Sequence, residues 1–221
     1  LSIRDGAKVG TSSFGEGNAG TTTVNATESI VIDGAVRVDL NTGTEVQPSS
    51  ISSELFEGAV GQGGTVTITT PDLSITDGGL VSALSFGDGS AGGVNIVASD
   101  SLVVDGTAPF SALGSRNRIS QISVLAGPAS TGVAGTLSIQ SPSIRVANGA
   151  RITAESQGIG TGGDISIRGQ DLVLDNGLIS AETVSNTGGD ITLRIADVIS
   201  LTGGSRISAT AGTARRARAS S

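Results

Sequence analysis

The stretch Leu73–Ser101, LSITDGGLVSALSFGDGSAGGVNIVASDS, holds one complete unit of the pattern that decides the fold. A short alternating run at 73–76 leads into an Asp-Gly-Gly turn at 77–79. A second run at 80–85 leads into a glycine-rich corner at 87–93, and a third alternating run follows that corner. Alternation with a period of two predicts β-strands, and Gly beside Asp is typical of the sharp turns between strands.

The same unit recurs along the chain. Its opening signature is apolar-x-apolar followed by Asp, Asn or Thr and Gly. The signature begins near residues 1, 30, 73, 102, 144, 172 and 199, with steps of 29, 43, 29, 42, 28 and 27 residues. Such self-similarity indicates a solenoid. We therefore predict an all-β fold, a parallel β-helix with three strands per coil and about seven coils. Residues 1–211 form its single domain, and 212–221 is a disordered basic tail or the end of a segment.

The alternation also predicts which side chains face inward. In the third strands, one inward ladder comprises Val24, Ile68, Ile96, Ile139, Ile167 and Leu193. The middle strands are predicted at AKVGTS, AVRVDL, LVSALS, TAPFSAL, RITAES, LISAET and RISATA. A stack of these strands buries a narrow, aliphatic core.

Composition narrows the possible chemistry. The chain has no Cys and no His, which excludes thiolate or imidazole metal sites, Cys nucleophiles and His-dependent triads. It has four Phe and neither Trp nor Tyr, and 34 of its 221 residues are Gly. The net charge of −7 disfavours nucleic acid as a partner, because phosphate contacts need clustered Lys and Arg. No apolar run approaches the length of a membrane span, and no signal peptide opens the chain.

The two long steps predict ordinary coils with insertions of about 14 residues. We place these insertions within Leu40–Gln62 and Leu113–Val133, after the middle strand, so that both leave the same edge of the helix. Loops on a rigid scaffold commonly carry binding. The candidate ligand-contact residues are therefore Glu45, Gln47, Glu54, Phe56, Arg116, Arg118 and Gln121.

Recurring carboxylates are the main candidates for catalysis. Stacked carboxylates could serve general acid/base chemistry or hold a metal in a β-helix lyase or glycosidase. However, Asp-Gly is also a favoured turn pair, and an active site needs one special coil rather than the same Asp in most coils. We therefore predict no catalytic, cofactor-binding or metal-binding residue, no cofactor and no enzyme activity. The residues concerned lie at the first turn: Asp5, Asp33, Asp77, Asp105 and Asp175.

Two further motifs are interpreted as structural. GxGxxG occurs at 15–20, 87–92 and 158–163, but a β-strand is expected after each copy. A dinucleotide site needs a helix there, so these copies predict corners. The TxTxT run at 65–69 could suggest an ice-binding face, but the equivalent positions of other coils are mixed polar residues, which favours a solvated face.

The repeats resemble those of filamentous-haemagglutinin-like exoproteins. The similarity rests on LSIRDGAKVGTSSFGEGNAGTTTVNATES at 1–29 and its copy at 73–101. It is strongest to the S-layer family adhesins of cyanobacteria, whose repeats read roughly L-x-I-x-D/N-G-A-x-I-x-A-x-T-x-G-x-G-x-G-G-x-I-x-I. The resemblance covers nearly the whole chain to Ala211, although the second and fourth coils depart from it in their middles.

The resemblance implies a right-handed β-helix, two-partner secretion through an outer-membrane β-barrel partner, and a role at the bacterial cell surface. We expect a structural stalk segment of a secreted adhesin that mediates attachment. Its partners would be a host, cell-surface or glycan receptor and, end to end, further copies of the chain. Two alternatives are a polysaccharide-active or carbohydrate-binding β-helix and, less favoured, an ice- or mineral-binding face.

Overall fold

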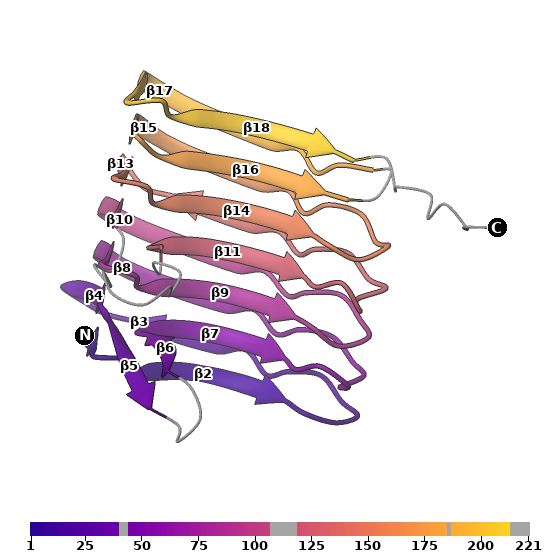
Figure 1. Ribbon diagram of the computed structural model, residues 1–221. Helices are drawn as coiled ribbons and strands as arrows, with labels where there is room; N and C mark the ends of the chain where they lie inside the picture. Colours follow the sequence, from indigo (N-terminus) through magenta and orange to yellow (C-terminus); the bar gives the residue numbers. More distant parts are fainter. Residues whose placement is uncertain (40–43, 107–118, 185–186, 213–221) are drawn as a thin grey trace.

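The computed structural model describes residues 1–39, 44–106, 119–184 and 187–212, and their secondary structure is all-β (Figure 1). Within these ranges no residue is helical. Two long parallel sheets, one of nine strands and one of seven, make up most of the structure. The seven-stranded sheet faces the viewer in Figure 1, and its strands stack in sequence order from one end of the molecule to the other. This stacking is what a repeat with a nearly fixed period produces.

The nine-stranded sheet combines the first and third runs of each repeat. In four places the third run of one repeat and the first run of the next form a single long strand. A shift in pairing register marks the point where the two runs meet, for example between Ala98 and Ser101. Its strands are β1 (Ser2–Arg4), β3 (Thr22–Asn25), β4 (Ser29–Asp33), β8 (Val66–Thr76), β10 (Val94–Asp105), β12 (Leu137–Gln140), β13 (Ser143–Ala147), β15 (Ile165–Asp175) and β17 (Ile191–Thr202).

The seven-stranded sheet contains the middle run of each repeat, in parallel pairing throughout. Its strands are β2 (Lys8–Ser13), β7 (Ser50–Leu55), β9 (Leu80–Ser85), β11 (Gln121–Ala126), β14 (Arg151–Ser156), β16 (Leu178–Thr183) and β18 (Arg206–Ala211). Five of the seven agree with the predicted middle strands.

The other two middle strands were predicted wrongly. AVRVDL is not in this sheet: its first five residues are β5 (Ala35–Asp39), which pairs antiparallel with β6 (Thr44–Pro48). The strand that pairs with β2 and β9 is β7, whose Ile51 and Leu55 are fully buried. TAPFSAL lies outside the described residues, and β11 takes the place that it was assigned between β9 and β14. Both segments alternate as well as the true strands do, so alternation alone could not separate them.

The insertions therefore precede the middle strand instead of following it. The first begins directly after Gly34 and ends before Ser49, not within Leu40–Gln62. The second lies between Gly106 and Ser120, not within Leu113–Val133. They do leave from the same side, because β4 and β10 are both neighbours of β8 in the nine-stranded sheet.

The core consists of aliphatic columns that run along the stack. The predicted third-strand ladder is confirmed: its members pair in register, and Ile68, Ile96, Ile139 and Ile167 are no more than 1% exposed. Val24 and Leu193, at the two ends of the ladder, are partly buried against the same core. The middle strands contribute a second column, which comprises Ile51, Val81, Ile122, Ile152 and Ile179.

The glycine-rich corners bring backbones into close contact. A Cβ on Gly92 would collide with the carbonyl oxygen of Gly64, and a Cβ on Gly135 would collide with that of Gly92. Gly92 closes the second GxGxxG copy, and a β-strand, β10, follows it. The copies are corners, as predicted, and the glycines let successive repeats stack at strand spacing.

Candidate functional site

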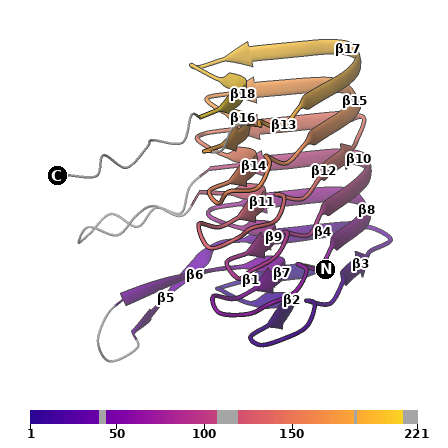
Figure 2. The ribbon, with the colours of Figure 1, turned by 90° about the vertical axis from the view of Figure 1, so that its right-hand side faces the viewer.

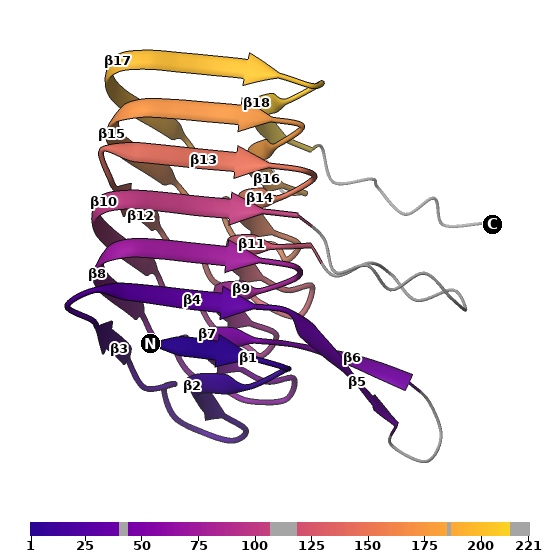
Figure 3. The same cartoon turned by 90° about the vertical axis from the view of Figure 1, so that its left-hand side faces the viewer.

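The clearest departure from the regular repeat is the edge where the two insertions leave the sheets. At the first insertion, β5 and β6 form a hairpin that projects away from both sheets (Figures 2 and 3). The chain leaves β4 through Gly34 and re-enters the seven-stranded sheet at Ser49. We refer to this edge, at the ends of β4 and β10, as the insertion edge.

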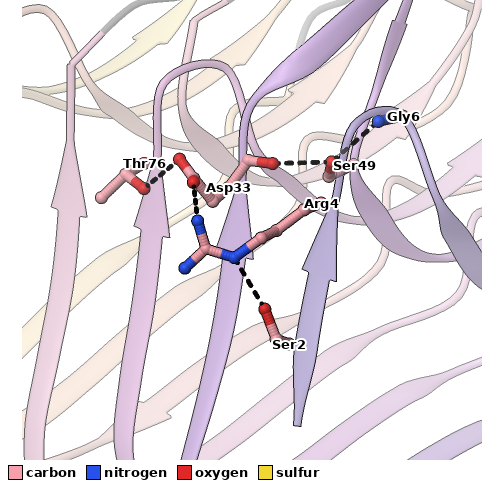
Figure 4. A network of polar contacts seen from close by, with 6 residues as sticks. All are labelled: Ser2, Arg4, Gly6, Asp33, Ser49 and Thr76. Carbon is pink, nitrogen blue, oxygen red and sulfur yellow. Dashed lines mark hydrogen bonds and ion pairs between the residues drawn. The ribbon is translucent and has the colours of Figure 1, made fainter.

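A buried serine closes the base of the first insertion (Figure 4). The Ser49 hydroxyl donates to the carbonyl oxygen of Asp33 at 2.8 Å and accepts from the Gly6 N–H at 3.1 Å. The Ser49 N–H also donates to the Gly34 carbonyl at 3.0 Å. The two ends of the insertion are thereby held together, so the stacked strands on either side keep their register.

The second insertion has the same base. The Ser120 hydroxyl donates to the carbonyl oxygen of Asp105 at 2.7 Å and accepts from the Gly78 N–H at 2.9 Å. The Ser120 N–H donates to the Gly106 carbonyl at 3.1 Å. Both serines are fully buried, so the hydroxyls have protein partners in place of water.

The five aspartates of the first turn fall into two columns offset by one residue. Asp33, Asp105 and Asp175 end their strands, whereas Asp5 and Asp77 occupy turns with φ near +50°. The first three are also separated along the stack, because Thr76 and Ala147 lie between them. The expectation of one carboxylate at the same position in most coils was therefore wrong, since alternation with uncharged residues keeps the carboxylates apart.

Each strand-end carboxylate has a donor on a neighbouring repeat. Asp33 accepts from Arg4 at 2.5 Å and from Thr76 at 2.9 Å (Figure 4). The Asn148 amide donates to Asp105 at 2.7 Å, and the Thr202 hydroxyl donates to Asp175 at 3.2 Å. The Arg4–Asp33 ion pair is partly exposed, so we expect it to contribute less than about 1 kcal/mol. These contacts join neighbouring repeats and give the three strand-end carboxylates a structural role.

The predicted contact residues at the insertion edge are Gln47 and Gln121. Gln47 is exposed on β6 opposite Val36, and Gln121 begins β11, where its amide donates to the Ser123 hydroxyl at 3.3 Å. Glu45 lies on β6 opposite Val38, and its side chain falls outside the described residues. Arg116 and Arg118 lie outside the described residues altogether.

Glu54 and Phe56 belong to the other end of β7. Glu54 is half-buried, and the Phe56 ring stacks on Phe14 with centroids 4.4 Å apart and planes at 13°. Phe56 is about 20 Å along the strand from Ser50, so the structure does not gather the predicted residues into one site. Sequence reasoning missed that Phe14, Phe56 and Phe86 each follow a middle strand directly. That signal is visible only after the middle strands are placed correctly.

Two pairs of like charges lie in register across the sheets. On the seven-stranded sheet, Glu155 pairs with Glu182, and Arg206 from the next strand approaches Glu182 at 3.5 Å. On the nine-stranded sheet, Arg168 pairs with Arg194. Among the described residues no carboxylate lies within 4.0 Å of either guanidinium. Like charges directly opposite each other are destabilising, so the repulsion between these two arginines is not offset by an ion pair.

Within the described ranges, no group of three or more His, Cys, Asp or Glu side chains could hold a metal ion. Nor do these ranges contain a helix long and apolar enough to cross a membrane. Comparison with protein-family models, with curated proteins and with solved structures gave no significant match. The fold and the site thus define a class, an all-β repeat protein built on long parallel sheets. Assignment to a family rests on the sequence resemblance alone.

Proposed function

We propose that the chain is a structural segment of a large secreted bacterial surface adhesin of the filamentous-haemagglutinin-like type. In this proposal the strands wind as a right-handed parallel β-helix of about seven coils, three strands to a coil. Secretion of the whole protein uses an outer-membrane β-barrel partner, and attachment is to a cell-surface or glycan receptor. The observation that supports this most is the in-register stacking of every repeat from β1 to β18 in two parallel sheets.

The insertion edge supports a stalk that carries contact loops. Ser49 and Ser120 close two insertions with the same hydrogen bonds, so each insertion is an addition to the stack that leaves the strands beneath it undisturbed. Such an arrangement separates the two tasks of an adhesin. The repeats supply length and rigidity, and the insertions supply variable contacts.

Attachment of the source bacterium tests the proposal. The full-length protein is compared with a version in which 34–48 is replaced by Asp-Gly, which copies the regular turn Thr76-Asp77-Gly78-Gly79-Leu80. We expect the bacterium to adhere less well, while surface amounts of the protein stay unchanged. Undiminished adhesion of a strain that lacks the whole protein would contradict the proposal.

The alternative is a β-helix enzyme acting on polysaccharides. The observation that favours it is the set of carboxylates along one edge, Asp33, Asp105 and Asp175. All three are engaged with donors from neighbouring repeats, which favours the structural interpretation. Turnover of neutral or acidic glycans by the purified chain, abolished by an Asp105→Asn substitution, would establish the enzyme in place of the stalk.

A further inference from the structure

Among the residues that the structure describes, Arg168–Arg194 is the one in-register like-charge pair without a compensating group on its own sheet. The Glu155–Glu182 pair serves as its counterpart, because both pairs join the fifth and sixth repeats. The acidic pair has Arg206 beside it, and the Ser180 hydroxyl donates to Glu182 at 2.7 Å. The basic pair has neither a carboxylate nor a hydrogen-bond acceptor among the described residues.

The pair is also specific to its place in the stack. The equivalent positions on preceding strands carry uncharged residues, namely Asn25, Thr69, Val97 and Gln140. The preceding residues Ile167 and Leu193 face inward in the core ladder, so Arg168 and Arg194 both point outward, and both are exposed. Two guanidinium-bearing strands about 4.8 Å apart place ten N–H donors over one small area.

We propose that Arg168 and Arg194 bind a carboxylate of a sparsely charged acidic polysaccharide. A guanidinium binds a carboxylate through two parallel N–H···O bonds, and an anion between two guanidiniums also removes their repulsion. This proposal adds a ligand class to the proposed attachment function. It rests on that function only for the place at which the protein meets its ligand.

The surroundings of the pair select the kind of polymer. Ser166 and Thr192, two residues earlier on the same face, are exposed hydroxyls suited to sugar hydroxyl groups. Asp164 and Asp190 lie four residues before the arginines, about 13 Å along the strands, where the Asp190 N–H donates to the Asp164 carboxylate at 2.8 Å. These carboxylates and the net charge of −7 repel a densely charged chain such as DNA or heparin.

Binding of hyaluronan oligosaccharides, which carry one carboxylate per disaccharide, tests the proposal with the purified 221-residue chain. Biolayer interferometry compares the wild type with R168Q/R194Q and with K8Q/R151Q. The second variant removes the same charge from exposed positions on the other sheet, where Lys8 and Arg151 also lack an ion-pair partner among the described residues. We expect R168Q/R194Q to lose affinity about tenfold or more, and K8Q/R151Q to stay within about twofold of the wild type.

Three results would overturn the proposal. These are no hyaluronan binding by the wild type, an equal loss in the two variants, or tighter binding to heparin than to hyaluronan. Thermal melts establish that both variants fold, and the melting temperature of R168Q/R194Q should equal or exceed that of the wild type because a repulsion is removed. Failure of this assay leaves the surface location of the protein untouched, and that location is tested separately.

Discussion

Ser49 and Ser120, which lie two repeats apart, make the same hydrogen bonds at the bases of the two insertions. Each hydroxyl bridges the carbonyl of a strand-end aspartate, Asp33 or Asp105, to the N–H of a turn glycine, Gly6 or Gly78. The bridge joins three parts of the chain: the end of a first strand, the start of a middle strand and the turn of a neighbouring repeat. Ser205 bridges the Thr202 carbonyl and the Gly177 N–H in the same way at a turn without an insertion, so both insertions leave the stack from an ordinary turn of the repeat.

Removing this bridge should destabilise the stack locally. Ser49→Ala and Ser120→Ala leave a buried carbonyl and a buried N–H without their partner, so we expect each to lower the free energy of unfolding by about 1–3 kcal/mol. Urea denaturation followed by circular dichroism measures the change. Ser138→Ala, at an exposed position, is the control and should change it by less than about 0.5 kcal/mol. Equal effects of the three substitutions would show that the serines do not hold the insertions.

The corner glycines should not tolerate a methyl group. Gly92→Ala pushes a Cβ into the carbonyl oxygen of Gly64, so we expect a loss of about 1–3 kcal/mol or a failure to fold. Gly15→Ala is the matched control, because no atom lies within 4 Å of the added Cβ. Thermal denaturation of the two variants distinguishes them. A Gly15→Ala protein as unstable as Gly92→Ala would refute the close stacking of the corners.

Truncation of two adjacent residues of β10 should destabilise the protein to very different extents. Ile96 is 1% exposed within the core ladder, and Ile96→Ala should cost about 2–5 kcal/mol through the lost burial and the cavity. Val97 is 43% exposed on the outer face, and Val97→Ala should cost less than about 1 kcal/mol. The free energies of unfolding in urea test this contrast. Similar costs at both positions would contradict the assignment of the inner face.

The first insertion should be dispensable for folding. Replacing 34–48 by Asp-Gly gives the second repeat the same turn length as the third repeat. We therefore expect the melting temperature to stay within about 5 °C of the wild type. Differential scanning calorimetry of the purified chain gives the measurement. Loss of cooperative unfolding would mean that β5 and β6 belong to the core of the fold.

The repeat and its inward ladder could be predicted because they depend on local alternation. Residues such as Ile68 and Ile139 recur at the same position of the repeat. That position is fixed by the alternation of inward and outward side chains and by the distance from the preceding glycine corner. The middle strands of the second and fourth repeats could not be placed in this way. Ala35–Asp39 alternates as Ser50–Leu55 does, and only the pairing partners decide which of them enters the sheet.

The candidate site was harder to predict because its contacts cross between repeats. Whether Asp33 lies beside Arg4 or Asp5 depends on a shift of one residue in register, which the sequence pattern leaves open. The same holds for Arg168 beside Arg194 and for Arg206 beside Glu182. Phe56 was predicted to share a contact loop with Gln47, but they lie at opposite ends of β7 because the insertion precedes that strand.

Surface labelling of the source cells tests the proposed function most directly. An antibody raised against the 221-residue chain is applied to intact cells and to permeabilised cells, and bound antibody is counted by flow cytometry. The proposal predicts full labelling of intact cells and its loss after brief protease treatment of the cell surface. Labelling that appears only after permeabilisation would contradict a surface adhesin.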